Sequence, residues 1–223
     1  MASWNKVTES LIWRITGKLR AQRNGLFLKR MCPTCDTTVL DLGSEDGSQI
    51  ASFYPYPHRV TIADIKEEPL RKGVAQYGFA GYVVLPRHGP LPIADQAFDV
   101  VYCNSVIEHV TASRFLDQTT FVRLAQRNQR RFADEIRRVG RRYFVQTPNR
   151  HFPIEAHSLL PFTGYLSARR NAQLAHLLKR IWIKQWSGGS WLLTREKMIE
   201  LFPGARIIPE RFFGLTKSWI AVG

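Results

Sequence analysis

The chain has 223 residues, 44% hydrophobic and 22% charged, which excludes intrinsic disorder and allows one domain, 1–223, with a sizeable core. A net charge of +14 favours an anionic partner, such as nucleic acid, an acidic membrane surface or a phosphorylated substrate. The alternative is an enzyme whose surface is basic without such a partner. Three cysteines exclude a disulfide framework, and without a long apolar run a cytoplasmic protein is expected, with peripheral membrane contact left open.

Residues 1–30 are predicted to form a basic amphipathic helix. The apolar residues that recur at helical spacing are Trp4, Val7, Leu11, Ile15 and Leu19. A helix packed on the domain is the favoured interpretation, and a helix on a membrane surface is the alternative. Cys32 and Cys35 then form a CxxC pair. Because a structural zinc site needs four ligands and the chain has no second pair, we expect a turn here and no metal.

Strands and helices are predicted to alternate along the middle of the chain. Strands are expected at residues 37–43, 59–64, 81–85, 97–103 and 142–146, and helices at 48–54, 67–77 and 115–139. Two closing strands are expected at 205–213 and 218–222. This order predicts an α/β fold: a Rossmann-like, mostly parallel seven-stranded sheet with helices on both faces. Its ligand site should lie at the carboxyl ends of the parallel strands.

The alternation stops after the fifth strand. Residues 150–190 are rich in prolines, glycines and aromatic side chains and contain a helix-like stretch at 172–186. We expect this segment to be a helical lid that covers the strand ends and binds the acceptor substrate of the reaction. A basic rim around apolar side chains is typical of a site for an amphipathic or lipid-linked molecule.

A glycine loop follows the first strand. Gly43 and Gly47 would let the backbone approach a ligand at the start of the next helix. Asp64 ends the second strand, 21 residues after Gly43, close to the spacing of about 20 in dinucleotide folds. A carboxylate there suits the ribose hydroxyls of an adenosine, whereas a solvated turn carboxylate is the alternative. NAD enzymes share this loop, so the loop alone does not choose the cofactor.

The stretch from Leu91 to Val110, LPIADQAFDVVYCNSVIEHV, resembles the class I S-adenosylmethionine-dependent methyltransferases, in particular their type 11 branch. Residues 142–149 are similar to the fifth strand of this family, and the resemblance covers about residues 38–149. It implies S-adenosylmethionine as the cofactor and a methyltransferase activity. The hypothesis of an NAD-dependent oxidoreductase leaves this stretch unexplained, and the chain lacks a Tyr-x-x-x-Lys pair for hydride transfer.

The resemblance also implies roles for single residues. The methionine part of the cofactor is expected to contact Asp41, Gly43, Ser44, Glu45 and Gly47. The ribose and adenine are expected to contact Asp64, Ile65, Pro90 and Leu91. The end of the fourth strand is expected to supply Asn104, Ser105 and Ile107.

Two positions depart from the family pattern. Glu45 stands where the loop often has a glycine, and its side chain must point away from the cofactor or the loop must shift. Residues 85–89 contain no acidic residue to bond the adenine amine. These departures motivate a non-catalytic cofactor-binding relative as one alternative.

Candidate catalytic residues are His109 first, then His157 and Glu155. A base is needed only if the acceptor is a hydroxyl or an acidic carbon; a helix anchor or a loop residue is the alternative for each. We expect methyl transfer to a small-molecule, glycan or lipid-linked acceptor, with O-methylation favoured over N-methylation. An RNA methyltransferase is the competing hypothesis because of the charge.

Overall fold

A computed structural model describes residues 2–87, 89–113, 115–154, 159–178 and 189–223, with the backbone alone for 2–15, 164 and 168. One seven-stranded sheet forms its centre, in the order β3-β2-β1-β4-β5-β7-β6. Its strands are β1 (Val39–Leu42), β2 (Val60–Asp64), β3 (Gly81–Val84), β4 (Phe98–Asn104), β5 (Gly140–Pro148), β6 (Arg206–Phe212) and β7 (Leu215–Val222). The first five strands run parallel, and β7 pairs antiparallel with β5 and β6. The predicted Rossmann-like, mostly parallel sheet is confirmed.

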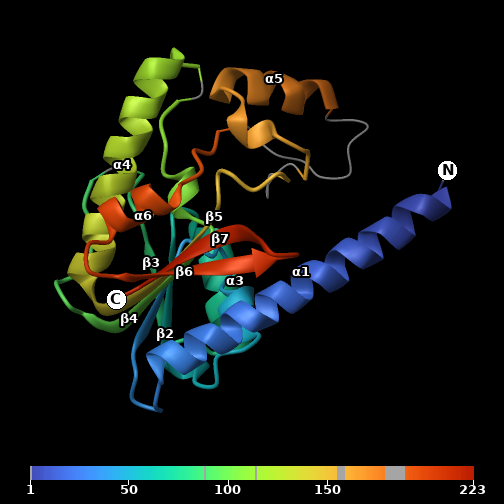
Figure 1. The fold of residues 1–223 in the computed structure, drawn as a ribbon. Coiled ribbons are helices and arrows are strands. Elements are labelled where there is room, and N and C mark those ends of the chain that lie inside the picture. Colours follow the sequence, from blue (N-terminus) through green and yellow to red (C-terminus); the bar gives the residue numbers. More distant parts are fainter. Residues whose placement is uncertain (1, 88, 114, 155–158, 179–188) are drawn as a thin grey trace.

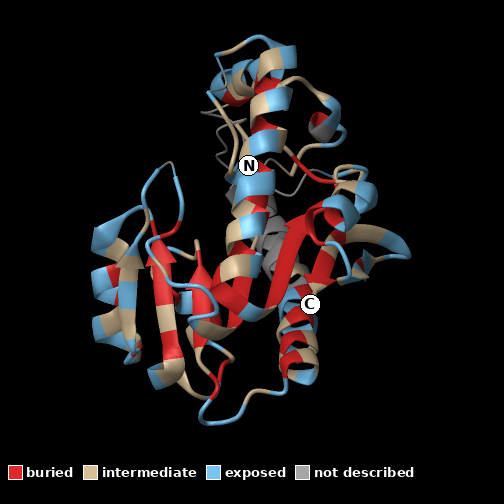
Figure 2. Cartoon of the chain, turned by 90° about the vertical axis from the view of Figure 1, so that its left-hand side faces the viewer, coloured by how far each residue is buried: buried red, intermediate tan, exposed pale blue. Residues whose placement is uncertain are grey.

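Helices cover both faces of this sheet. They are α1 (Ala2–Met31), α2 (Ser48–Ala51), α3 (Glu67–Tyr77), α4 (Gln118–Val139), α5 (Ala168–Leu178) and α6 (Arg195–Leu201). Alternate strand residues face two separate cores, one shared with α4 and α6 and the other with α1, α2 and α3. The central strands β1, β2, β4 and β5 are therefore largely buried on both sides, whereas the edge strands β3 and β6 and the outer helix surfaces are partly exposed (Figure 2).

Local sequence explains where α4 begins and which side it buries. The Asp117 carboxylate accepts a hydrogen bond from the backbone N–H of Thr120 at 2.9 Å and so caps the first turn. Phe121, Ala125 and Ala133 then recur on the buried side. The predicted helical region at 115–139 is therefore a single helix that starts at this cap.

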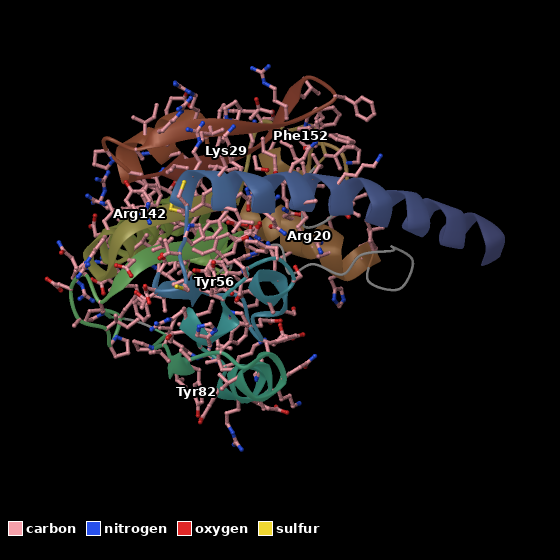
Figure 3. The ribbon with its side chains drawn as sticks, turned by 90° about the horizontal axis from the view of Figure 1, so that it is seen from below. Arg20, Lys29, Tyr56, Tyr82, Arg142 and Phe152 are labelled. Carbon is pink, nitrogen blue, oxygen red and sulfur yellow. The ribbon has the colours of Figure 1, made fainter. Side chains whose placement is uncertain are left out.

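The predicted N-terminal helix is present and ends at Met31. In its second half Leu19, Arg23, Phe27 and Met31 are buried at a spacing of four residues, so this half packs on the domain. Its first half projects beyond the domain, past Arg20 (Figures 1 and 3). Among the described residues, no helix combines the length and the apolar character that crossing a membrane requires.

A helical insertion follows β5, as predicted. Its described residues contain a short 3-10 turn, η3 (Thr163–Tyr165), and α5. Figure 1 shows α5 near the end of the sheet where the parallel strands finish, next to the beginning of α4. Residues 155–158 and 179–188 of the predicted lid, including Glu155 and His157, lie outside the described residues.

Candidate active site

The loop after β1 approaches its neighbours so closely that it needs glycines. Gly43 has φ 85°, and its backbone N–H donates to the carbonyl of Ala63 on β2 at 2.7 Å. A Cβ at Gly43 would lie 2.5 Å from a methyl carbon of Val106. Gly47 precedes α2 with φ 71°, and a Cβ there would lie 2.6 Å from the ring of Phe79. The glycines thus let this loop, which we call the cradle, pack directly against neighbouring side chains, where a Cβ at either position would collide.

Asp41 lies in β1 directly below this cradle and is fully buried. One oxygen accepts a hydrogen bond from the Ser44 hydroxyl, and the other, Oδ1, has no hydrogen-bond partner in the described part of the chain. Burial raises the pKa of Asp41 to about 7; the Ser44 hydrogen bond lowers it, and the nearby carboxylates of Asp64 and Asp46 raise it further. A buried carboxylate with a spare oxygen suits a cationic ligand group.

Glu45 meets the expectation that its side chain points away from the cradle. Its backbone takes φ 57°, and its exposed carboxylate pairs with the Lys66 ammonium at 3.3 Å. Its backbone N–H donates to one oxygen of Asp64 at 3.2 Å, and the N–H of Lys66 donates to the other at 3.2 Å. The Asp64 carboxylate is therefore held at the tip of β2 beside the glycine loop.

The end of β4 is held by a side-chain network. The Asn104 amide donates to Gln49 Oε1 at 3.1 Å, and Gln49 Nε2 donates to the Tyr102 hydroxyl at 3.0 Å. Asn104 Oδ1 accepts from Arg23 on α1 at 2.5 Å. The side chain of Asn104 is thus committed to protein partners, which leaves its backbone for the predicted contact with a ligand.

Arg23 connects three distant parts of the chain. Its guanidinium donates to both carboxylate oxygens of Glu210 on β6, each at 2.9 Å, and both residues are buried. Burial raises the pKa of Glu210. The charge of Arg23 and a hydrogen bond from the Ser218 hydroxyl outweigh burial and hold this pKa below its ordinary value. Sequence analysis missed this network. Arg23 and Glu210 are 187 positions apart, and neither stands in a recognisable motif.

The residues that follow β4 are fixed by β5 and α4. Ser105 has φ 56°, and its hydroxyl donates to the Gln146 side chain at 2.8 Å. Ile107 begins a 3-10 turn, η2 (Ile107–His109), and its carbonyl accepts from Gln129 of α4 at 3.1 Å. His109 ends this turn with an exposed side chain. The turn holds His109 at the same end of the sheet as the glycine loop.

The side expected for the adenine contains Ile65, Pro90 and Leu91. Ile65 is 45% exposed directly after β2, Pro90 is exposed, and the Leu91 side chain is buried. The Leu91 backbone N–H donates to Glu135 at 2.6 Å, and its carbonyl accepts from Arg138 at 3.1 Å. Two residues of α4, Glu135 and Arg138, thus hold the loop at Leu91.

These features together fit S-adenosylmethionine. The glycine loop at the tip of β1 would take its methionine part, and the spare Asp41 oxygen suits its positive charge. The Asp64 carboxylate retains lone pairs for ribose hydroxyls, since each oxygen accepts only one of the two hydrogen bonds described above. The strand order brings β2, β1 and β4 side by side, so all three tips lie at the same edge of the sheet, where such sheets bind their ligands.

Comparisons with known proteins agree with this geometry. Residues 40–142 match a family model described as "Methyltransferase domain". The trans-methyltransferase CalH in complex with SAH superposes with a TM-score of 0.53 at 12% identity, covering 89% of this chain and 54% of that one. The methyltransferase domain of bacterial CtHen1-C gives 0.52 at 14% identity, covering 92% and 97%.

A third structure is the complex between the Trm112 activator and the putative methyltransferase of Haloferax volcanii, with a TM-score of 0.52 at 13% identity, covering 100% of this chain and 92% of that one. No curated protein sequence matches the chain. Fold and site define a class I methyltransferase. The family model places a methyltransferase domain at residues 40–142, and S-adenosylmethionine is the cofactor that this match and the site support.

Proposed function

We propose that the protein methylates a hydroxyl group of a small-molecule, glycan or lipid-linked acceptor that carries an apolar part. The supporting observation is a concentration of exposed apolar side chains on the insertion after β5. Ile154, Phe162, Tyr165 and Leu177 are 45%, 64%, 52% and 75% exposed. An apolar acceptor would remove this surface from water, and contiguous exposed apolar surface is typical of binding sites.

When bound, S-adenosylmethionine supplies an activated methyl group on its sulfonium. The protein's own residues then orient the two reactants and exclude water. Asp64 and the glycine loop hold the nucleoside, and Asp41 faces its cationic end. His109 is the candidate base, because a hydroxyl must lose its proton as the methyl group arrives. The insertion after β5 would hold the acceptor.

The proposal is tested by methyl transfer to a panel of matched acceptors. Hydroxyl acceptors with and without a long apolar chain are compared with RNA. We expect the apolar acceptors to be preferred by about tenfold or more in kcat/KM, since each buried methylene contributes about 0.8 kcal/mol. Leu177→Ser should reduce this preference, whereas Leu215→Ser, at a residue that is 53% exposed on β7, should not. Preferred methylation of RNA would contradict the proposal.

A second variant tests the base. His109→Ala is expected to lower kcat by about a hundredfold or more while the affinity for S-adenosylhomocysteine stays unchanged. If kcat keeps within a factor of about three, His109 does not take the proton, and an amine acceptor that needs no base becomes the better assignment.

A further inference from the structure

A basic groove is lined by residues of α4 and α6, which pack against each other (Figure 1), and it contains none of the residues proposed for the cofactor. Its volume is about 260 Å³, close to the lower end of the range of about 300–1,000 Å³ for small-molecule sites. Its rim carries Arg123, Arg127, Arg130, Lys197 and Glu200. Four cationic side chains thus share one acidic neighbour.

The acidic side chain neutralises only one end of this groove. Glu200 forms ion pairs with Arg130 and with Lys197, the second at 2.6 Å. Within the part of the chain that the structure describes, Arg123 and Arg127 have no acidic partner. They lie four residues apart on α4, so their side chains project from the same face of the helix. Two uncompensated guanidinium groups therefore sit together at the other end.

The wall of the groove beside these arginines is apolar and aromatic. It is formed by Trp191, which is partly exposed, with the buried Leu193 and Leu201. The guanidinium carbon of Arg150 lies 4.2 Å from the centroid of the Trp191 ring, and the Phe121 ring packs edge-to-face with it, so these contacts fix the ring while part of it stays exposed. An apolar wall next to unpaired cations suits a molecule that has an anionic group and an apolar part.

We propose that this groove binds a small phosphorylated molecule. Arg123 and Arg127 bind the phosphate oxygens, because the guanidinium fork matches the geometry of a phosphate and charge-assisted bonds to it are strong. Trp191 covers the apolar or aromatic part of the ligand. Towards the carboxyl end of α4, Arg137 pairs with Asp134, which favours a compact anion at the groove over a long polyanion along the helix.

Two residues that line the groove also form hydrogen bonds with η2, the turn that carries His109. Gln129 donates from one amide nitrogen to the carbonyls of Ile107 at 3.1 Å and of Trp191 at 2.9 Å. The backbone N–H of Trp191 donates to the carbonyl of Glu108 at 2.8 Å. A molecule bound against Trp191 therefore lies one hydrogen bond away from η2, where it can serve as the phosphorylated end of an acceptor or as an effector.

Calorimetric titration of the full chain with phenyl phosphate tests the proposal without any methyl transfer. We expect saturable binding of phenyl phosphate, weaker binding of inorganic phosphate and none of phenol. The double variant Arg123→Gln/Arg127→Gln should weaken the binding of phenyl phosphate by about tenfold or more, because it removes two charge-assisted contacts. The matched control is Arg131→Gln/Arg137→Gln, which removes the same charge from the same helix outside the groove lining and should leave the affinity unchanged.

Three results would overturn the proposal. The first is an equal loss of affinity in both double variants, which indicates general attraction by the basic surface. The second is the absence of phenyl phosphate binding together with retention on vesicles of anionic phospholipid, and the third is the same absence together with binding of single-stranded RNA. Unchanged binding of S-adenosylhomocysteine by both double variants confirms that they are folded, and it keeps this test independent of the acceptor proposed above.

Discussion

Replacing Asp41 by asparagine should stabilise the cofactor-free protein at neutral and higher pH. In the folded state burial raises the pKa of this carboxyl from 3.8 to about 7. Between these values the native state holds a proton that the unfolded chain has released, so the free energy of unfolding falls as the pH rises. The loss is complete above the folded-state pKa, where it amounts to about 4 kcal/mol. Below a pH of about 4 the carboxyl contributes no such loss.

Asparagine keeps the shape of the side chain and its hydrogen bond from Ser44 but carries no charge at any pH. The stability difference between Asp41→Asn and the wild type should therefore grow by about 2.5 kcal/mol in favour of the variant between about pH 5 and about pH 8. Urea unfolding of both proteins at the two pH values measures this difference directly. A difference that is the same at both pH values would refute the reasoning, because it would mean that Asp41 is already ionised at the lower one.

The affinity for the cofactor should rise with pH, whereas the stability of the cofactor-free protein falls. The amino group of S-adenosylhomocysteine is a cation, which favours the ionised form of Asp41. We expect the affinity of the wild type to rise with pH through about 7 and the affinity of Asp41→Asn to be lower and flat. Calorimetry across this range checks the expectation, and a pH-dependent affinity in the variant would assign the titration to another group.

Two further substitutions test the cradle and the buried ion pair. Gly43→Ala should destabilise the protein by about 2 kcal/mol more than Gly78→Ala, because both glycines have positive φ but only Gly43 lacks space for a Cβ; equal losses in chemical unfolding would argue against the close approach at Gly43. Arg23→Met should cost about 3–5 kcal/mol, since it removes the bidentate partner of the buried Glu210 carboxylate and leaves it the more distant Lys217 ammonium at 3.9 Å. Adding Glu210→Met should recover much of that loss in a double-mutant cycle, and strictly additive losses would contradict a direct coupling.

The glycine loop and the strand tips could be predicted because their signals are local. A strand that ends at Gly43, with Gly47 four residues later, requires a tight turn wherever the chain folds, and Asp64 stands at the expected distance along the chain. For Glu45 the local argument left two outcomes, an outward side chain or a shifted loop, and the structure shows an exposed side chain paired with Lys66. The roles of these residues in cofactor binding stay predictions that the variants above can test.

By itself, the sequence determined the order of strands and helices, the Rossmann-like sheet and the residues placed at the ends of β1, β2 and β4, because hydrophobic periodicity and glycine placement act over a few residues. Only the tertiary structure decided that Arg23 bonds Asn104 and Glu210, and that Arg123 and Arg127 share a groove with Trp191. Such contacts join segments far apart along the chain, and they depend on how the helices pack against the sheet, which no local pattern encodes.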